Sequence, residues 1–149
     1  MKKTVRIVSL LLLAALCAVL LVSCSKYPSL KKAFEKKGYE ENEKLESLAA
    51  TIKEELEKED LVVELHLMTK TSNSLTSALI IEFKATDDLV KAYEDSATIQ
   101  GLVKDIESSE DVEKVYDALE EAGYVKGNCL VVPLSILYVN EITNIVKSV

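Results

Sequence analysis

The first 22 residues combine a basic start with a long apolar run, and this feature limits the fold of the chain most strongly. Lys2, Lys3 and Arg6 precede residues 7–22, in which Ser9 is the only interruption of an apolar sequence. This layout is typical of an export signal. A membrane-spanning helix is the alternative, but 16 residues rise only about 24 Å, less than a hydrocarbon core about 30 Å thick. We therefore expect residues 1–23 to be a cleaved signal peptide, and an uncleaved helix would change only the mode of anchoring.

The apolar run ends at a cysteine. Leu21, Val22, Ser23 and Cys24 form a tetrapeptide that resembles the lipobox of bacterial lipoproteins: aliphatic, small or aliphatic, small, then cysteine. The resemblance covers only the first two dozen residues. It implies that the signal is cut between Ser23 and Cys24 and that a diacylglyceryl group is attached to the Cys24 thiol, with further acylation of the new amino terminus. Buried acyl chains hold a protein on a bilayer, so the expected location is the extracytoplasmic face of the cell membrane, with membrane lipid as the partner of Cys24.

Charge is distributed unevenly along the expected mature chain. Removal of residues 1–23 takes away three basic residues and no acidic ones, so the formal charge falls from −7 to −10. Five lysines then lie close to the anchor: Lys26, Lys31, Lys32, Lys36 and Lys37. Each could add about 1 kcal/mol of attraction to anionic lipid, although a solvated, mobile tether would have the same composition. The acidic remainder disfavours nucleic acid as a partner, because phosphate binding needs clustered basic side chains.

Cysteine usage and length bear on domain organisation. Cys17 leaves with the signal and Cys24 is the expected lipid site, so Cys129 is the one thiol left and no internal disulfide is expected. The 126 residues after the cut can form a hydrophobic core without covalent cross-links. We expect a tether over residues 24–29 and a single globular domain over residues 30–149.

Helical periodicity dominates the start of that domain. Ser29 is a candidate N-cap for a helix over residues 30–37, which Gly38 could end. Residues 39–60 follow as one longer predicted helix with apolar residues at helical spacing and glutamates in its first turns, where negative charge favours the helix dipole. The apolar positions are Leu45, Leu48, Ala49, Ile52 and Leu56, and the glutamates are Glu40, Glu41 and Glu43.

An alternation of two predicts strands over residues 61–70 and 78–84, joined as a hairpin by a loop around residues 72–76. Both strands are apolar at most positions on both faces, so we expect the sheet to be covered on each side, at least in part. Leu61, Val63, Leu65, Leu67, Leu79, Ile81 and Phe83 form one face, and Val62, Glu64, His66, Met68, Ala78, Ile80 and Glu82 form the other.

The remaining pattern predicts three helices, a strand and an ambiguous end. A helix starts near Thr86, and two more occupy residues 97–122 with a break at Ser108 or Ser109, either of which could cap the last; Gly123 ends it. Residues 129–132 resemble a buried strand after a turn at residues 127–128, and residues 135–146 are a final helix or an edge strand, with the helix preferred. The predicted fold is α+β: a small, mainly antiparallel sheet of about three strands packed with several amphipathic helices.

Candidate chemistry is sparse. His66 is the one histidine, and its place on the less apolar strand face favours a partly exposed or satisfied polar side chain. Pairing of His66 with Cys129 as base and nucleophile lacks a supporting local pattern. The apolar neighbours of Cys129 favour a buried structural thiol, because such surroundings raise a thiol pKa.

The sequence predicts no catalytic residue, no metal site and no cofactor. A structural zinc site of the Cys and His type needs three or four such ligands, and the mature domain beyond Cys24 offers two. Phosphate-binding glycine loops and nucleophile-elbow motifs are absent, and the acidic clusters at residues 54–60 and 110–113 fit solvated helix faces. The favoured function is a non-enzymatic binding or interaction module with an unidentified protein or envelope ligand as partner. The alternative is a small extracytoplasmic hydrolase that uses scattered carboxylates.

Overall fold

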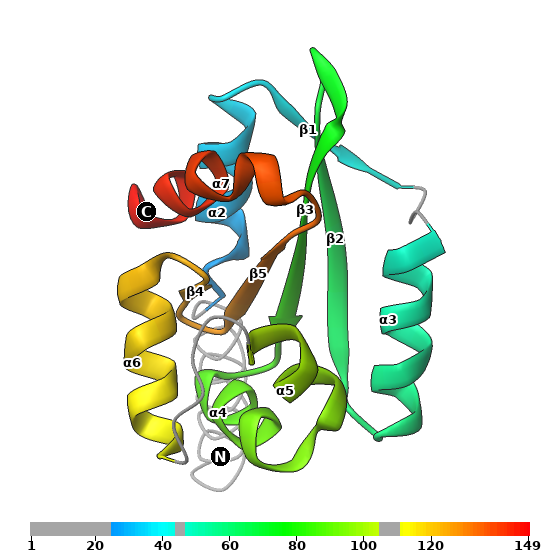
Figure 1. Cartoon of the computed structure of the whole chain (residues 1–149), viewed down its shortest axis with the longest axis vertical. Helices are drawn as coiled ribbons and strands as arrows, with labels where there is room; N and C mark the ends of the chain where they lie inside the picture. Colours follow the sequence, from blue (N-terminus) through cyan, green and yellow to red (C-terminus); the bar gives the residue numbers. More distant parts are fainter. Residues whose placement is uncertain (1–24, 44–46, 105–110) are drawn as a thin grey trace, which may run out of the picture.

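The computed structural model describes residues 25–43, 47–104 and 111–149, and in these ranges it shows an α+β fold (Figure 1). Residues 1–24, which include the expected signal and Cys24, lie outside the described residues. The elements are α2 (Tyr27–Glu35), β1 (Tyr39–Asn42), α3 (Ser47–Lys58), β2 (Val63–Lys70), β3 (Asn73–Phe83), α4 (Thr86–Asp95), α5 (Ala97–Val103), α6 (Val112–Ala122), β4 (Val125–Lys126), β5 (Cys129–Pro133), the 3₁₀ helix η1 (Ile136–Tyr138) and α7 (Val139–Lys147).

The strands form one antiparallel sheet in the order β1-β2-β3-β5-β4. It therefore has five strands rather than about three. The two short strands that the sequence analysis missed, β1 and β4, lie at its edges. Each is too short to show a period in the sequence, and each is held by pairing with a longer neighbour.

The sheet is covered on both faces, as the alternation predicts. On one face Leu79, Ile81 and Phe83 pack against α3, α4, α5 and α6. On the other, Ala78 and Ile80 pack with the buried side chains of α2 and α7, which lie side by side in Figure 1. The two apolar faces of the central strand β3 thus divide the core into two layers.

The prediction of a helix over residues 39–60 is wrong at its start, because residues 39–42 form β1. Gly38 adopts a φ of +81°, which a residue without Cβ reaches easily, and so the chain reverses after α2. Tyr39 is buried and packs edge-on to Phe34, with ring centroids 5.2 Å apart. A buried aromatic beside a strand edge outweighs the favourable dipole contribution of the glutamates, which is small for a surface charge.

The chain is already ordered in the segment predicted as a tether. Helix α2 begins at Tyr27 with Lys26 as N-cap and Pro28 in the first turn, so Ser29 lies inside the helix and is not its cap. The backbone N–H of Lys26 donates to Oδ1 of Asn128 at 3.0 Å. Residues 25–29 are therefore part of the folded body.

Smaller differences occur at the turns. Strand β3 begins at Asn73, so the hairpin turns at residues 71–72 instead of looping over residues 72–76, and the β2–β3 register shifts between Thr69 and Lys70. Asp111 caps α6, whereas the predicted caps Ser108 and Ser109 lie outside the described residues. Gly123 ends α6 with a φ of +87°, as predicted.

The C-terminal end is a strand followed by a helix, which confirms the preferred interpretation. Strand β5 ends at Pro133. Proline has no backbone N–H to donate, but at the last residue of a strand this removes no hydrogen bond from the middle of the sheet. Helix α7 then places Ile142, Ile145 and Val146 in the layer it shares with α2. The helical spacing of these residues explains why a helix forms in spite of their β-branched side chains.

Glu59 follows α3 and holds the start of α5. One of its oxygens accepts hydrogen bonds from the backbone N–H and the hydroxyl of Thr98, at 3.2 and 3.1 Å, and the other accepts from Oγ of Ser96. Ser96 in turn accepts from the N–H of Ile99 at 3.0 Å, which caps α5. These bonds, that from Ser96 first, lower the pKa of the Glu59 carboxyl.

A Glu59→Ala substitution is expected to lower the free energy of unfolding at neutral pH by about 0.5–2 kcal/mol, as for the loss of a helix cap. Because the folded-state pKa of Glu59 is depressed, this contribution is present above the unfolded value of about 4.3 and is lost as the pH falls through the folded value. Urea denaturation of the wild type and of Glu59→Ala from about pH 7 to about pH 3 should show that the difference in their free energies of unfolding shrinks as the pH falls. A difference that stays constant with pH would contradict this role. As the control, the exposed substitution Glu54→Ala should change the free energy of unfolding by less than about 0.5 kcal/mol.

Candidate functional site

Four charged or ionisable side chains meet on one end of the sheet face that α2 covers. They are Glu41 of β1, Glu64 and His66 of β2, and Glu82 of β3. Strand geometry brings them together: Glu64 lies directly opposite Glu82 in the antiparallel register, and His66 is two residues along β2 on the same face. Glu41 lies opposite Met68, the next residue of β2 on that face. Three neighbouring strands thus supply one histidine and three carboxylates.

Both nitrogens of the His66 ring face carboxylate oxygens. Nδ1 lies 2.9 Å from Oε1 of Glu41, and Nε2 lies 3.1 Å from Oε2 of Glu82. Oε2 of Glu64 is 3.9 Å from the same Nε2. The imidazole therefore bridges β1 and β3, with a third carboxylate beside it.

The first turn of α2 covers this group. The ring of Tyr27 stacks on that of His66 with centroids 3.5 Å apart and planes 13° apart. Lys31, one turn further along α2, donates to Oε2 of Glu41 at 2.6 Å. This bond, opposed by partial burial and aided by His66, lowers the pKa of Glu41 to about 2. The position of the imidazole is fixed by α2 as well as by the sheet.

Exposure differs across the group. The side chains of His66 and Glu82 are 13% and 16% exposed, whereas that of Glu64 is 79% exposed. Glu64 and Glu82 also border an open surface hollow of about 360 Å³, together with Ser25, Phe83 and Lys84. The outer side of the group is therefore reachable from solvent.

The prediction for His66 as a satisfied polar side chain is confirmed, but its partners were not foreseen. The strand alternation already places Glu64 and Glu82 on the same face as His66, and this was the one feature of the sequence from which these two partners could have been predicted. Glu41 fell in the segment predicted as a helix. The hydrogen bond from Oγ of Ser25 to Oε1 of Glu82 joins residues too far apart in sequence for any pattern to show.

Cys129 is a buried structural thiol, as predicted. It is fully buried, and burial first, then the charge of Glu82, raises its pKa to about 12. Its Sγ lies 3.7 Å from Oδ1 of Asn128. Within the described residues no hydrogen bond joins Cys129 to His66, so a nucleophile and base pair gains no support.

The five predicted membrane-proximal lysines lie in different surroundings. Lys31 is paired with Glu41, and the stem of Lys26 lies against the backbone at Gly127. Lys32, Lys36 and Lys37 are exposed on or after α2. The predicted cleavage and lipidation residues Ser23 and Cys24 lie outside the described residues.

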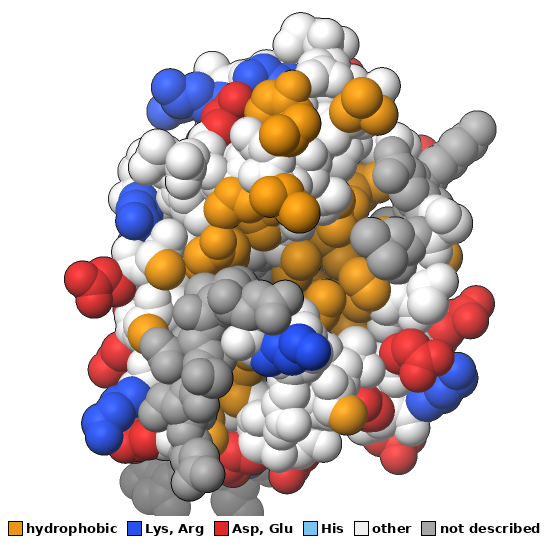
Figure 2. Space-filling view, in the orientation of Figure 1, with side chains coloured by type: hydrophobic (Ala, Val, Ile, Leu, Met, Phe, Trp, Pro, Cys, Tyr) orange, Lys and Arg blue, Asp and Glu red, His pale blue; other side chains and the backbone are white. Residues whose placement is uncertain are grey.

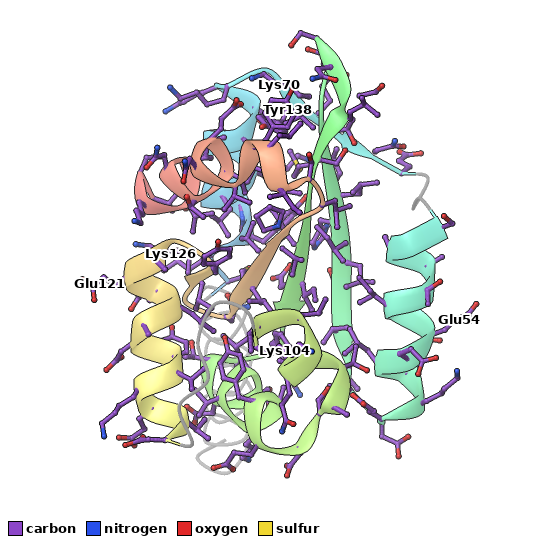
Figure 3. All side chains as sticks on the ribbon, in the orientation of Figure 1. Glu54, Lys70, Lys104, Glu121, Lys126 and Tyr138 are labelled. Carbon is purple, nitrogen blue, oxygen red and sulfur yellow. The ribbon has the colours of Figure 1, made fainter. Side chains whose placement is uncertain are left out.

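A second polar group ties the far end of β2 to α7. Lys70 donates to Oε1 of Glu141 at 2.6 Å, and the hydroxyl of Tyr39 donates to the same oxygen at 2.9 Å. Asn73 donates to the hydroxyl of Tyr138 at 2.7 Å, and Figure 3 shows Lys70 and Tyr138 close together at this end. The pairing of cation, carboxylate and hydroxyls fixes α7 on the sheet and needs no ligand.

An apolar hollow of about 130 Å³ lies where β5 meets η1 and α7. It is lined by Leu102, Tyr124, Val132, Pro133 and Ile136, among others. Figure 2 shows hydrophobic side chains gathering in this part of the surface, and Ile136 and Leu137 are 93% and 87% exposed.

None of the helices in the described ranges is long and apolar enough to cross a bilayer.

Within residues 25–43, 47–104 and 111–149, the geometry thus brings three ligand atoms of Glu64, His66 and Glu82 within 4.8 Å of one another. Comparison of the chain with protein-family models, with curated proteins and with solved structures gives no match.

Proposed function

We propose that the protein is a lipoprotein of the bacterial cell envelope, anchored through acylated Cys24 on the extracytoplasmic face of the membrane, and that its body is a non-enzymatic binding module. The observation that carries the proposal is the tetrapeptide at residues 21–24, placed at the end of a basic and then apolar leader. Diacyl modification there would hold the body on the bilayer far more firmly than one chain could.

The start of the folded body supports an anchor held close to the membrane. Ser25, the residue after the anchor, already bonds to Glu82, and Lys26 bonds to Asn128. The lipid would therefore be joined to the body without a spacer, which restricts the faces that the body can turn to the bilayer. Exposed Lys32, Lys36 and Lys37 would each add about 1 kcal/mol of attraction wherever they approach anionic lipid.

The described side chains favour binding over hydrolysis. His66 contacts carboxylates at both nitrogens, and among the described residues no Ser, Thr or Cys side chain hydrogen-bonds to its ring. Activation of a nucleophile needs such a contact. Of the scattered carboxylates of the alternative hydrolase, Glu59 and Asp111 cap helices and Glu41, Glu64 and Glu82 belong to the His66 group.

Mass spectrometry of the mature N-terminus tests the anchoring. We expect an N-terminal peptide that begins at Cys24 and carries the mass of a diacylglyceryl group, with or without a further acyl chain. A peptide that begins at Met1, or one that begins at Cys24 without added mass, would overturn the proposal. Peptides from α7 serve as the internal control for recovery of the chain.

A further inference from the structure

We propose that Glu64, His66 and Glu82 form a binding site for a divalent metal ion of the zinc type. The inference rests on the proposed function, in which the body is a binding module, and it names the ligand of that module. The site is built from Nε2 of His66 and one carboxylate oxygen of each glutamate, and these three atoms lie within 4.8 Å of one another.

The spacing of these atoms suits a single ion. Zn²⁺ binds imidazole nitrogen and carboxylate oxygen at about 2.0–2.2 Å in tetrahedral sites, so neighbouring ligand atoms lie about 3.4 Å apart. The distances from Nε2 to Oε2 of Glu82 and of Glu64 are 3.1 and 3.9 Å, on either side of this value. Glu64 is largely exposed, so a small rotation of its side chain completes the three contacts.

The ring of His66 presents both nitrogens to carboxylate oxygens, and which nitrogen donates depends on the tautomer. In the tautomer with its proton on Nδ1, the lone pair of Nε2 faces Oε2 of Glu82 at 3.1 Å. A metal ion between these two atoms would be bound by both.

The register places like charges opposite each other on the same face. Glu64 and Glu82 are direct cross-strand partners, an arrangement that destabilises a sheet when the charges are not compensated. Among the described residues, Lys31 neutralises Glu41, while the ion pairs of Glu64 and Glu82 involve only His66. The site therefore has an excess of negative charge, as expected of a cation site.

The surroundings supply the second shell that metal sites need. Oε1 of Glu41 lies 2.9 Å from Nδ1 of His66, the position from which a carboxylate orients a metal-bound histidine by accepting from its other ring N–H. Tyr27 holds the ring plane by stacking. Ser25 donates to Oε1 of Glu82, which leaves Oε2 turned toward Nε2.

The open hollow beside Glu64 and Glu82 gives an ion a path from solvent and room for water as a further ligand. One imidazole with two carboxylates suits Zn²⁺ and neighbouring transition metals, whereas Mg²⁺ and Ca²⁺ prefer oxygen ligands alone. Because Ser25 contacts Glu82 and directly follows Cys24, the ion would be held next to the lipid anchor. The module would thus retain a metal ion close to the membrane surface.

Titration of the full chain in detergent with Zn²⁺ alone, in competition with a chromophoric chelator, tests the site. The wild type should bind one equivalent, and Co²⁺ in its place should give the intense visible absorption of a four-coordinate site. A Glu64→Gln variant should bind at least about 10-fold more weakly, and Glu41→Gln should lose about 10–100-fold through the second shell. Glu64 is exposed, so its replacement should leave the fold intact, which far-UV circular dichroism checks.

Glu54→Gln is the matched control, since Glu54 is exposed on α3 and points away from the body (Figure 3). Its zinc affinity should equal that of the wild type. Absence of binding, or equal weakening by Glu54→Gln and Glu64→Gln, would overturn the inference and leave His66 as a side chain that only links Glu41 and Glu82. Either result would remove the proposed ligand without touching the anchor, which the mass of the Cys24 peptide decides independently.

Discussion

A Cys24→Ser substitution is expected to move the protein from a tightly bound membrane fraction to one that alkaline carbonate extracts. The hydroxyl cannot take the place of the thiol in lipid attachment, so the acyl chains, worth about 0.8 kcal/mol for each buried CH₂, are lost. A retained leader would offer only a 16-residue run that includes Ser9, about 24 Å of helix, which is shorter than the bilayer core of about 30 Å. Fractionation followed by detection of the chain, with fatty-acid labelling in parallel, measures both effects.

Cys17→Ser is the control for this experiment. It makes the same chemical change within the apolar run, and the expected cut before Cys24 removes it from the mature protein. It should leave membrane association and labelling unchanged. If Cys24→Ser remained as firmly bound and as strongly labelled as the wild type, the lipid anchor would be wrong, and the location proposed for the protein would be wrong with it.

The elements with a sustained period could be predicted from the sequence. Alternation over β2 and β3 correctly assigned Leu79, Ile81 and Phe83 to one layer and Ala78 and Ile80 to the other, because a fully buried strand must present apolar residues to both. The helical stripes of α4 and α6 were equally clear. Strands β1 and β4 are too short to show a period, and their pairing depends on neighbours that are distant in the sequence.

The candidate site could be predicted only in part, again because it depends on pairing between residues that are distant in the sequence. Alternation placed Glu64, His66 and Glu82 on one face, but their alignment depends on the hairpin register. The turn at residues 71–72 and the irregularity at Thr69 set that register, and a loop over residues 72–76 would have set a different one. The contacts of Ser25 and Lys26 with Glu82 and Asn128 bridge 57 and 102 residues, so only the folded chain shows that residues 25 and 26 are bonded to β3 and to Asn128.

Helix α2 connects the start of the folded body with the His66 group and the core, and a Phe34→Ala substitution is expected to weaken the docking of this helix strongly. Phe34 is fully buried with Leu30 and Ile142 in the layer between α2, α7 and the sheet, and its ring meets that of Tyr39 edge to face. Truncation of a buried phenylalanine lowers the free energy of unfolding by about 3–5 kcal/mol, a large part of the about 5–15 kcal/mol typical of a domain. Urea denaturation followed by circular dichroism measures this loss.

Lys32→Ala, on the exposed side of the same helix, is the matched control and should change stability by less than about 0.5 kcal/mol. At urea concentrations where the Phe34→Ala chain is still folded, loosening of α2 should also release Tyr27 from His66 and weaken zinc binding. A loss below about 1 kcal/mol would fall outside the range for a buried aromatic and would show that α2 is not packed on the sheet. In that case the tether predicted over residues 24–29 would extend through α2, and the proposed anchor would not fix the face that the body presents to the membrane.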